Sequence, residues 1–103
     1  MSTTEKLTNA EIAAAMDRHN APLDSAWQLQ DGKLHKEFRF DNFVNAMAFM
    51  QTAGEHAEAM DHHPEWCNVY NRVSIDLVTH SVGGLSDLDF KLAEKIEAVA
   101  NAL

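Results

Sequence analysis

The sequence has little of several features that mark specialised classes of protein. It contains one cysteine, Cys67, in 103 residues, which excludes an internal disulfide framework and a four-cysteine zinc module. No apolar run approaches the ~20 residues of a membrane-spanning helix, and the polar residues 1–11 are not typical of a secretory signal. Lysine and arginine are also scarce, 8 against 16 aspartates and glutamates, so the net charge of −8 argues against direct nucleic-acid binding. We therefore expect a small protein of a reducing compartment, the cytoplasm.

The composition that remains is that of an ordinary globular domain. Hydrophobic residues make up 46% of the chain and charged residues 23%. The sequence shows no internal repeat, no low-complexity segment and no long linker. We predict one domain over residues 1–103.

The first half of the chain predicts a helix followed by a β-hairpin. Thr8 to Glu11 form a capping box that starts the helix, and Pro22 stops it. Trp27 and Leu29 alternate with polar residues, as do the apolar residues of 34–40. Asp31-Gly32 between these two strands favours a two-residue hairpin turn.

The second half predicts a long helix, two strands and a last helix. Asp41 is the expected cap of the long helix, which should end near Asp61. Its expected buried stripe, with Val44 and Met60 beside it, consists of Phe43, Met47, Met50, Gly54 and Ala57. Strands follow at residues 66–70 and 73–77, then a turn at 83–84. The last helix begins at Ser86, with Asp89 in its first turn.

The resulting order, αββαββα, predicts an α+β fold. Each strand alternates apolar and polar residues, which favours a four-stranded antiparallel sheet with three helices packed on one face. The other face is then free for a partner or an oligomer.

Six histidines are a high count for this length, and they fall into two groups. His19, His35 and His56 lie in regular helical or strand patterns, where a surface position is the ordinary interpretation. His62 and His63 lie in a break beside Pro64, and His80 ends a strand. These three residues either converge on one pocket or belong to polar turns.

Proton transfer suits three such histidines better than the alternatives. Histidine titrates near neutrality, so it can act as an acid or a base. A metal site is less favoured, because adjacent histidines rarely face one ion and no helical ligand spacing is present. Cys67 in its strand is interpreted as a buried or spectator thiol, and neither a G-x-S-x-G motif nor a phosphate-binding glycine loop is present.

The segment EAMDHHPEWCNVYNRVSIDLVTHSVGGLSDLD, residues 58–89, closely resembles the pterin-4a-carbinolamine dehydratases. The family pattern of an acidic residue, His-His-Pro, an aromatic residue, a distant histidine and an aspartate falls on Glu58, His62, His63, Pro64, Tyr70, His80 and Asp89. Cys67 stands where animal relatives would carry an aromatic residue. The resemblance implies the same α+β fold over the whole chain.

The resemblance also implies a function and partners. Family members remove water from the 4a-hydroxytetrahydropterin left by aromatic amino acid hydroxylases, without a metal or an organic cofactor. A functional link to phenylalanine hydroxylase and a homodimer or homotetramer are implied as well. Animal members double as dimerisation cofactors of a homeodomain transcription factor, so a protein-interaction module is the alternative function. A regulatory role in hydroxylase expression is a third interpretation.

The roles implied for individual residues are as follows. His62 is expected as the principal acid/base, His80 as the second, and His63 as a residue that orients the pterin. Glu58 and Asp61 are expected to orient histidines or to contact the pterin. The remaining expected substrate-binding residues are Val78, Thr79 and Ser81. Trp66 either stacks near the ligand or belongs to the core. By strand parity, His80 places the pocket off the helix-packed face, unless the strand ends by Thr79.

Overall fold

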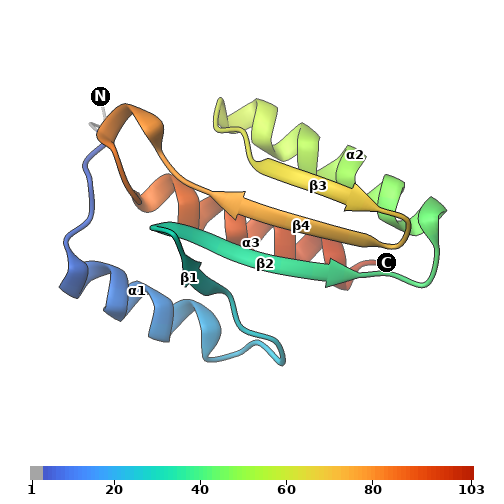
Figure 1. Ribbon diagram of the computed structural model, residues 1–103, viewed down its shortest axis with the longest axis horizontal. Coiled ribbons are helices and arrows are strands. Elements are labelled where there is room, and N and C mark those ends of the chain that lie inside the picture. The colour runs from blue at the N-terminus through green and yellow to red at the C-terminus, as the bar shows by residue number, and fades with distance from the viewer. Residues whose placement is uncertain (1–3) are drawn as a thin grey trace.

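The computed structural model of the chain describes residues 4–103, which fold in the order αββαββα (Figure 1). The elements are α1 (Asn9–Asn20), β1 (Gln28–Gln30), β2 (Lys33–Arg39), α2 (Phe43–Met60), β3 (Glu65–Val69), β4 (Arg72–Leu77), the short 3₁₀ helix η1 (His80–Val82) and α3 (Asp87–Asn101).

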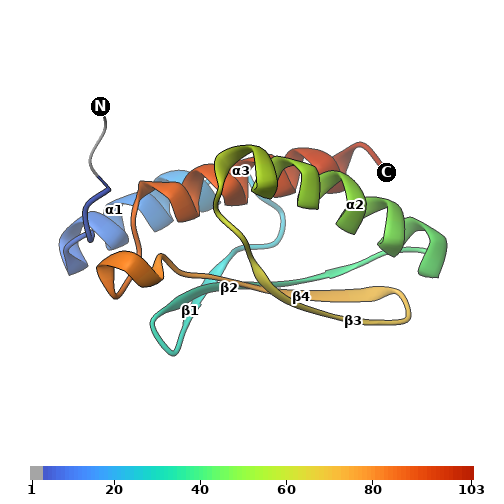
Figure 2. The same ribbon diagram turned by 90° about the horizontal axis from the view of Figure 1, so that it is seen from above.

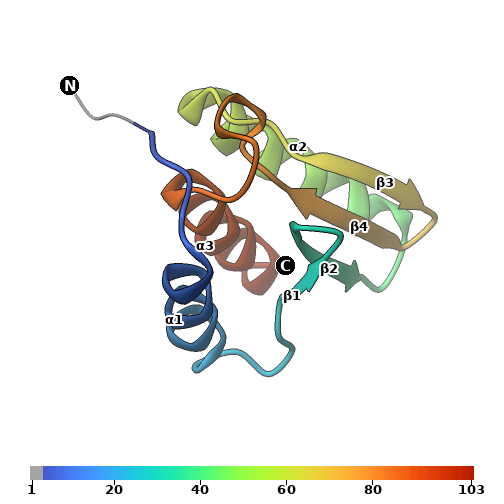
Figure 3. The same ribbon diagram turned by 60° about the vertical axis from the view of Figure 1, so that its left-hand side comes forward.

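The strands form one antiparallel sheet in the order β1-β2-β4-β3. The three α-helices cover one face of this sheet and leave the other face open (Figure 2). Helix α3 lies in the middle of the helical layer, between α1 and α2 (Figure 3). This arrangement confirms the predicted α+β fold class. Among residues 4–103, no helix combines the length and the apolar character needed to cross a membrane.

The local sequence signals that start and connect elements are confirmed. The Thr8 hydroxyl accepts from the Glu11 amide at 3.1 Å, and the Glu11 carboxylate accepts from the Thr8 amide at 2.9 Å. Ser86 and Asp89 form a second capping box at α3. Asp31 and Gly32 have φ values of 53° and 76°, as a type I′ hairpin turn requires. Strands β1 and β3 each differ from the prediction by about a residue. Strand β3 ends at Val69 because Tyr70 (φ 52°) already belongs to the turn.

The prediction for α2 is wrong in two respects. Its N-cap is Asn42 rather than Asp41, and the Asn42 side chain accepts from the Asn45 amide at 2.9 Å. The buried residues are Ala46, Phe49, Ala53 and Ala57. Two expected stripe residues, Phe43 and Met47, are instead exposed by 44% and 50%, and Val44 beside the stripe is exposed by 73%. Helix α2 has apolar residues on more than one side, and the side with the alanines is the one that packs against the rest of the domain.

The core contains a buried ion pair between Lys36 and Glu97, which the sequence pattern did not predict. Lys36 lies on the helix-facing side of β2, where its ammonium group donates to the Glu97 carboxylate and to the Ser25 carbonyl, the latter at 2.7 Å. The Trp27 indole donates to the same Glu97 oxygen at 2.9 Å. Period-two alternation alone did not place a lysine on the buried face of a strand.

His19 was expected at the surface, but it is half-buried against the core. Its ring lies edge-on to Trp27 and Phe90, with centroid separations of 6.2 and 6.0 Å. Its Nε2 atom is buried and has no hydrogen-bond partner among the described residues. Burial lowers the pKa of His19, so the neutral ring is favoured.

Candidate functional site

The candidate residues gather at the corner where β4 ends and β3 begins. Glu65 of β3 pairs with Asp76 of β4 in antiparallel register. The residues before Glu65 and those after Asp76 therefore lie close together. Residues 62–64 lead into β3, and residues 78–80 follow β4. We call this region the histidine corner.

His62 lies on the inner side of the corner and is held by Asp89. Its Nε2 atom is 2.6 Å from the Asp89 Oδ1 atom, and the two side chains are 9% and 0% exposed. The His62 amide also donates to the Ala57 carbonyl at 3.0 Å, which ties the residue to the end of α2. His62 is therefore fixed by both its backbone and its ring.

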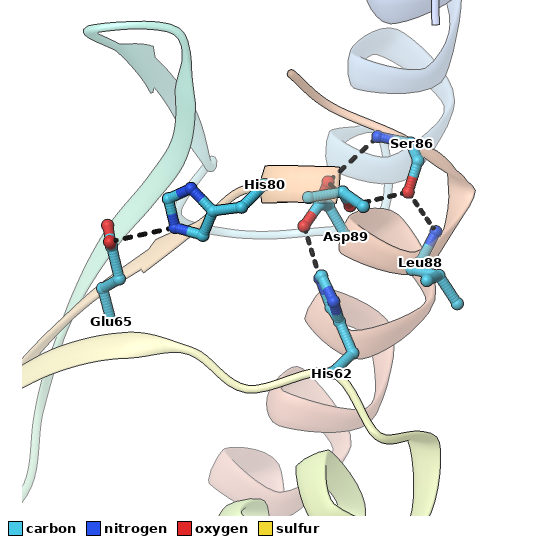
Figure 4. Close-up of polar contacts among 7 residues, drawn as sticks. His62, Glu65, His80, Ser86, Leu88 and Asp89 are labelled. Atoms are coloured by element: carbon cyan, nitrogen blue, oxygen red, sulfur yellow. Dashed lines mark hydrogen bonds and ion pairs between the residues drawn. The ribbon is translucent and has the colours of Figure 1, made fainter. Parts of the chain in front are cut away.

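The second oxygen of Asp89 joins two further segments. Its Oδ2 atom accepts from the Thr79 hydroxyl at 2.8 Å and from the Ser86 amide at 2.9 Å. The Thr79 and Ser86 hydroxyls are 2.7 Å apart. The Ser86 hydroxyl also accepts from the Leu88 amide (Figure 4). One carboxylate thus caps α3, anchors the residue after β4 and orients His62. Thr79, an expected substrate-binding residue, is buried in this network.

His63 points outward from the same loop. Its Nε2 atom is 2.7 Å from the Glu58 carboxylate, and the two side chains are 57% and 80% exposed. Asp61 is also exposed, and its backbone adopts the left-handed conformation that ends α2. Asp61 and Glu58 were expected to orient histidines or to contact the substrate. The structure brings Glu58, but not Asp61, into contact with a histidine of the described chain.

His80 projects from the start of η1 toward β3, on the side of the open sheet face (Figure 4). Its Nε2 atom is 3.4 Å from one oxygen of Glu65, and its side chain is 74% exposed. The other oxygen of Glu65 accepts from the Lys33 ammonium group at 2.5 Å. This hydrogen bond with Lys33, and to a smaller extent His80, lowers the pKa of Glu65.

The structure resolves the question of strand parity. Strand β4 ends at Leu77, Thr79 turns inward to Asp89, and His80 lies on the side of Glu65 and Asp76. The inner His62 and the outer His80 therefore approach the corner from different sides (Figure 4). Of the other expected substrate-binding residues, Val78 is half-buried and Ser81 is exposed.

The other candidate residues lie outside these histidine–carboxylate pairs. Trp66 packs against the core on the helix side of the sheet, near Gly54 of α2, which favours its interpretation as a core residue. The Cys67 thiol is exposed. Residues 4–103 hold no group of three side chains suited to bind a metal ion. A cavity of about 640 Å³ lies elsewhere, lined in part by Lys36, Phe40 and Glu97.

Sequence reasoning missed two polar contacts of the open face. Glu65 was not singled out, although it follows His-His-Pro directly, and neither was its partner Lys33. His35 lies on the open face as expected, but its Nδ1 atom is 2.9 Å from Asp76, a carboxylate partner that was not foreseen. Cross-strand register places Glu65, Asp76 and His35 in one row, and this register is the signal that predicts the contact between His35 and Asp76.

The fold and the site together define an α+β domain with a corner of histidine–carboxylate pairs. The family model described as Pterin 4 alpha carbinolamine dehydratase matches residues 5–99, so the chain belongs to that family. A relative from Solibacter usitatus (strain Ellin6076) that bears the name of this dehydratase is 50% identical over 97 residues. That match covers 94% of this chain and 97% of the relative.

Solved structures extend the comparison. A protein from Brucella melitensis, described as a transcriptional coactivator/pterin dehydratase, is 43% identical with a TM-score of 0.82. The match covers 93% of this chain and 99% of that one. A pterin dehydratase-like protein described as a RuBisCO assembly factor in the alpha-carboxysome matches with a TM-score of 0.65. At 22% identity, over 75% of this chain and 92% of that one, this match shows the shared fold alone.

Proposed function

We propose that this chain is a lyase that dehydrates 4a-hydroxytetrahydropterin to quinonoid dihydropterin and water. The observation that carries the proposal is the histidine corner of a chain in this family. Each candidate histidine there has its Nε2 atom directed at its own carboxylate: His62 at Asp89, His63 at Glu58 and His80 at Glu65. The Nδ1 atom of each ring is left as the other site for proton exchange.

The reaction needs two proton transfers on different sides of the substrate. The bond between C4a and the hydroxyl oxygen breaks, and a protonated imidazole gives its proton so that water leaves. The ring nitrogen next to C4a loses its proton to a base as the carbon–nitrogen double bond forms. Paired carboxylates suit this chemistry because they stabilise the protonated form of each imidazole and orient its ring.

Exposure suggests how the histidines divide this work. From the sequence, His62 was expected as the principal acid/base. Its side chain is only 9% exposed, whereas His63 and His80 are 57% and 74% exposed. We propose that His63 and His80 exchange protons with the substrate directly. His62, locked by Asp89, then holds the loop that carries His63.

A coupled assay tests the proposal and the division of roles. Phenylalanine hydroxylase with excess tetrahydropterin generates the 4a-hydroxy intermediate, whose transient absorbance is followed with and without this protein. We expect the wild type to shorten the transient. His63→Gln and His80→Gln should each lose about 10²–10⁴-fold of the acceleration, the range typical of one positioned proton transfer.

The matched control is His35→Gln, because His35 also has a carboxylate partner but lies outside the corner. It should keep wild-type activity. His62→Gln separates the two assignments: a loss as large as that of His63→Gln returns the principal role to His62. A wild-type protein that leaves the intermediate to decay at its spontaneous rate contradicts the proposed function.

A protein-interaction module remains the second candidate function. The observation in its favour is the apolar surface of α2, where Phe43, Val44 and Met47 are exposed. A homodimer or homotetramer formed through this surface is part of our proposal and is compatible with catalysis. A folded oligomer without dehydratase activity favours the module alone.

A further inference from the structure

The open face beside His80 carries a chain of charged side chains, of which the proposed reaction uses only the contact between His80 and Glu65. Glu65 is its centre, with Lys33 on one carboxylate oxygen and His80 on the other. The contact with His80 joins the start of β3 to the residue that opens η1. The contact with Lys33 reaches across β4, because β2 and β3 lie on opposite sides of that strand.

We propose that Glu65 is a positioning residue for His80 and that Lys33 sets how strongly Glu65 holds that ring. The inference rests on the proposed function, in which His80 exchanges a proton with the substrate. His80 is not held by burial as His62 is, since its side chain is 74% exposed. Glu65 is the carboxylate that the structure places at its Nε2 atom, 3.4 Å away.

The two partners of Glu65 compete for its charge. Lys33 is the closer one, at 2.5 Å, and its hydrogen bond draws negative charge from the carboxylate. Removing Lys33 therefore leaves Glu65 a stronger acceptor for His80, whereas removing the Glu65 carboxylate leaves His80 without a partner. The proposal thus requires that the loss at Glu65 has no matching loss at Lys33, although the two side chains contact each other.

The structural arm of the test does not depend on activity. Long-range ¹H–¹⁵N spectra of the free protein report which ring nitrogen of His80 carries the proton. We expect the proton on Nε2 in the wild type and in Glu65→Gln, whose amide oxygen still accepts it. Glu65→Ala should populate both forms. Carbon-13 titration of Glu65 should show its lowered pKa returning toward the ordinary value in Lys33→Met, and to a smaller extent in His80→Ala.

The kinetic arm measures kcat and KM for dehydration. Glu65→Gln should lower kcat by about 2- to 10-fold with little change in KM, because exposed ion pairs are weak and the amide cannot stabilise the protonated ring. Glu65→Ala should lower kcat at least as much. Lys33→Met should leave kcat unchanged or raise it, whereas a merely structural role for the Lys33–Glu65 pair predicts losses in both variants.

Glu37→Gln is the matched control. Glu37 lies on the same open face, where it contacts Ser74 and Arg39 instead of His80. It should leave both the His80 spectrum and kcat as in the wild type. The proposal is overturned if Glu65→Ala gives the His80 spectrum of the control, or if Glu65→Ala and Lys33→Met reduce kcat alike. If the wild type has no dehydratase activity, the proposed function fails, and the spectra alone decide whether Glu65 orients His80.

Discussion

At the scale of the residue, Asp89 shows how far sequence reasoning reached into the site. The spacing from Ser86 predicted its capping role, which one carboxylate oxygen performs. The bond from its other oxygen to His62 joins residues 27 positions apart, and no local pattern encodes such a contact. The histidines themselves were found because they stand in a break beside Pro64 and at a strand end. Their carboxylate partners, except Glu58, required the tertiary structure.

The buried pair of Lys36 and Glu97 should dominate the response of the core to single substitutions. We expect Glu97→Ala to lower the free energy of unfolding by about 3–5 kcal/mol, because the Lys36 charge is left buried without its partner. The double variant Lys36→Met/Glu97→Leu should lose much less, since no charge is then buried. Urea unfolding followed by Trp27 fluorescence measures both.

Glu94→Ala is the control for this comparison, because Glu94 is exposed one turn earlier on α3. It should change stability by no more than about 0.5 kcal/mol. A loss for Glu97→Ala as small as that of the control would show that the pair contributes little.

His19 should make the fold sensitive to acid. Burial lowers its pKa, the carboxylates of Glu94 and Glu97 oppose this effect and Lys36 adds to it. Because the folded pKa lies below the unfolded value of about 6.5, the neutral ring stabilises the fold above that pH. This contribution is lost as the pH falls toward the folded pKa.

This prediction is tested by the urea concentration at the midpoint of unfolding, measured at neutral pH and at about pH 5. The lower pH lies below the pKa of a histidine in the unfolded chain. His19→Leu keeps an apolar contact with Trp27 and Phe90 but does not titrate, so it should lose less stability on acidification than the wild type. His80→Gln, at an exposed position, should follow the wild type. Equal losses in wild type and His19→Leu would refute the assignment to His19.

At the scale of the element, the starts of α1 and α3 and the hairpin turn were predictable, whereas the N-cap and the packing face of α2 were not. Capping boxes at Thr8 and Ser86 and the turn at Asp31-Gly32 depend on residues close in sequence. Helix α2 carries apolar residues on several sides, and only the neighbouring α3 and sheet select the face with alanines. Small side chains allow the close approach, which a rule based on large apolar residues misses.

The end of α2 offers a test of backbone conformation at a candidate site residue. Asp61 has φ 50° and ψ 42°, a left-handed conformation that favours glycine. Asp61→Gly should therefore raise the free energy of unfolding by up to about 1 kcal/mol, while Asp61→Ala should lower it by a similar amount. Thermal unfolding of both variants gives the signs. A stabilising Asp61→Ala would mean that the conformation costs nothing at this position.

At the scale of the whole molecule, the order and layers of the fold followed from periodicity, but the state of association did not. The exposed apolar surface of α2 leads us to expect a mass above the 11.5 kDa of one chain in sedimentation experiments. Val44→Glu should shift the protein toward that single-chain mass, because it places a charge in the proposed interface.

Leu29→Glu, on β1 at the far edge of the sheet, is the control for association. It should sediment as the wild type does. A wild type of single-chain mass would rule out the proposed homo-oligomer, and dissociation by Leu29→Glu alone would move the interface to β1.

The three bonds of Asp89 also bear on how this chain tolerates mutation. In many proteins a functional group lowers the stability of the fold, so that its removal gives a more stable but inactive protein. Here the same carboxylate that orients His62 closes the first turn of the central helix and anchors the residue after β4. A substitution at this position lowers the amount of folded protein and the quality of the site together. A substitution of Asp89 therefore cannot increase the stability of the fold at the expense of the site.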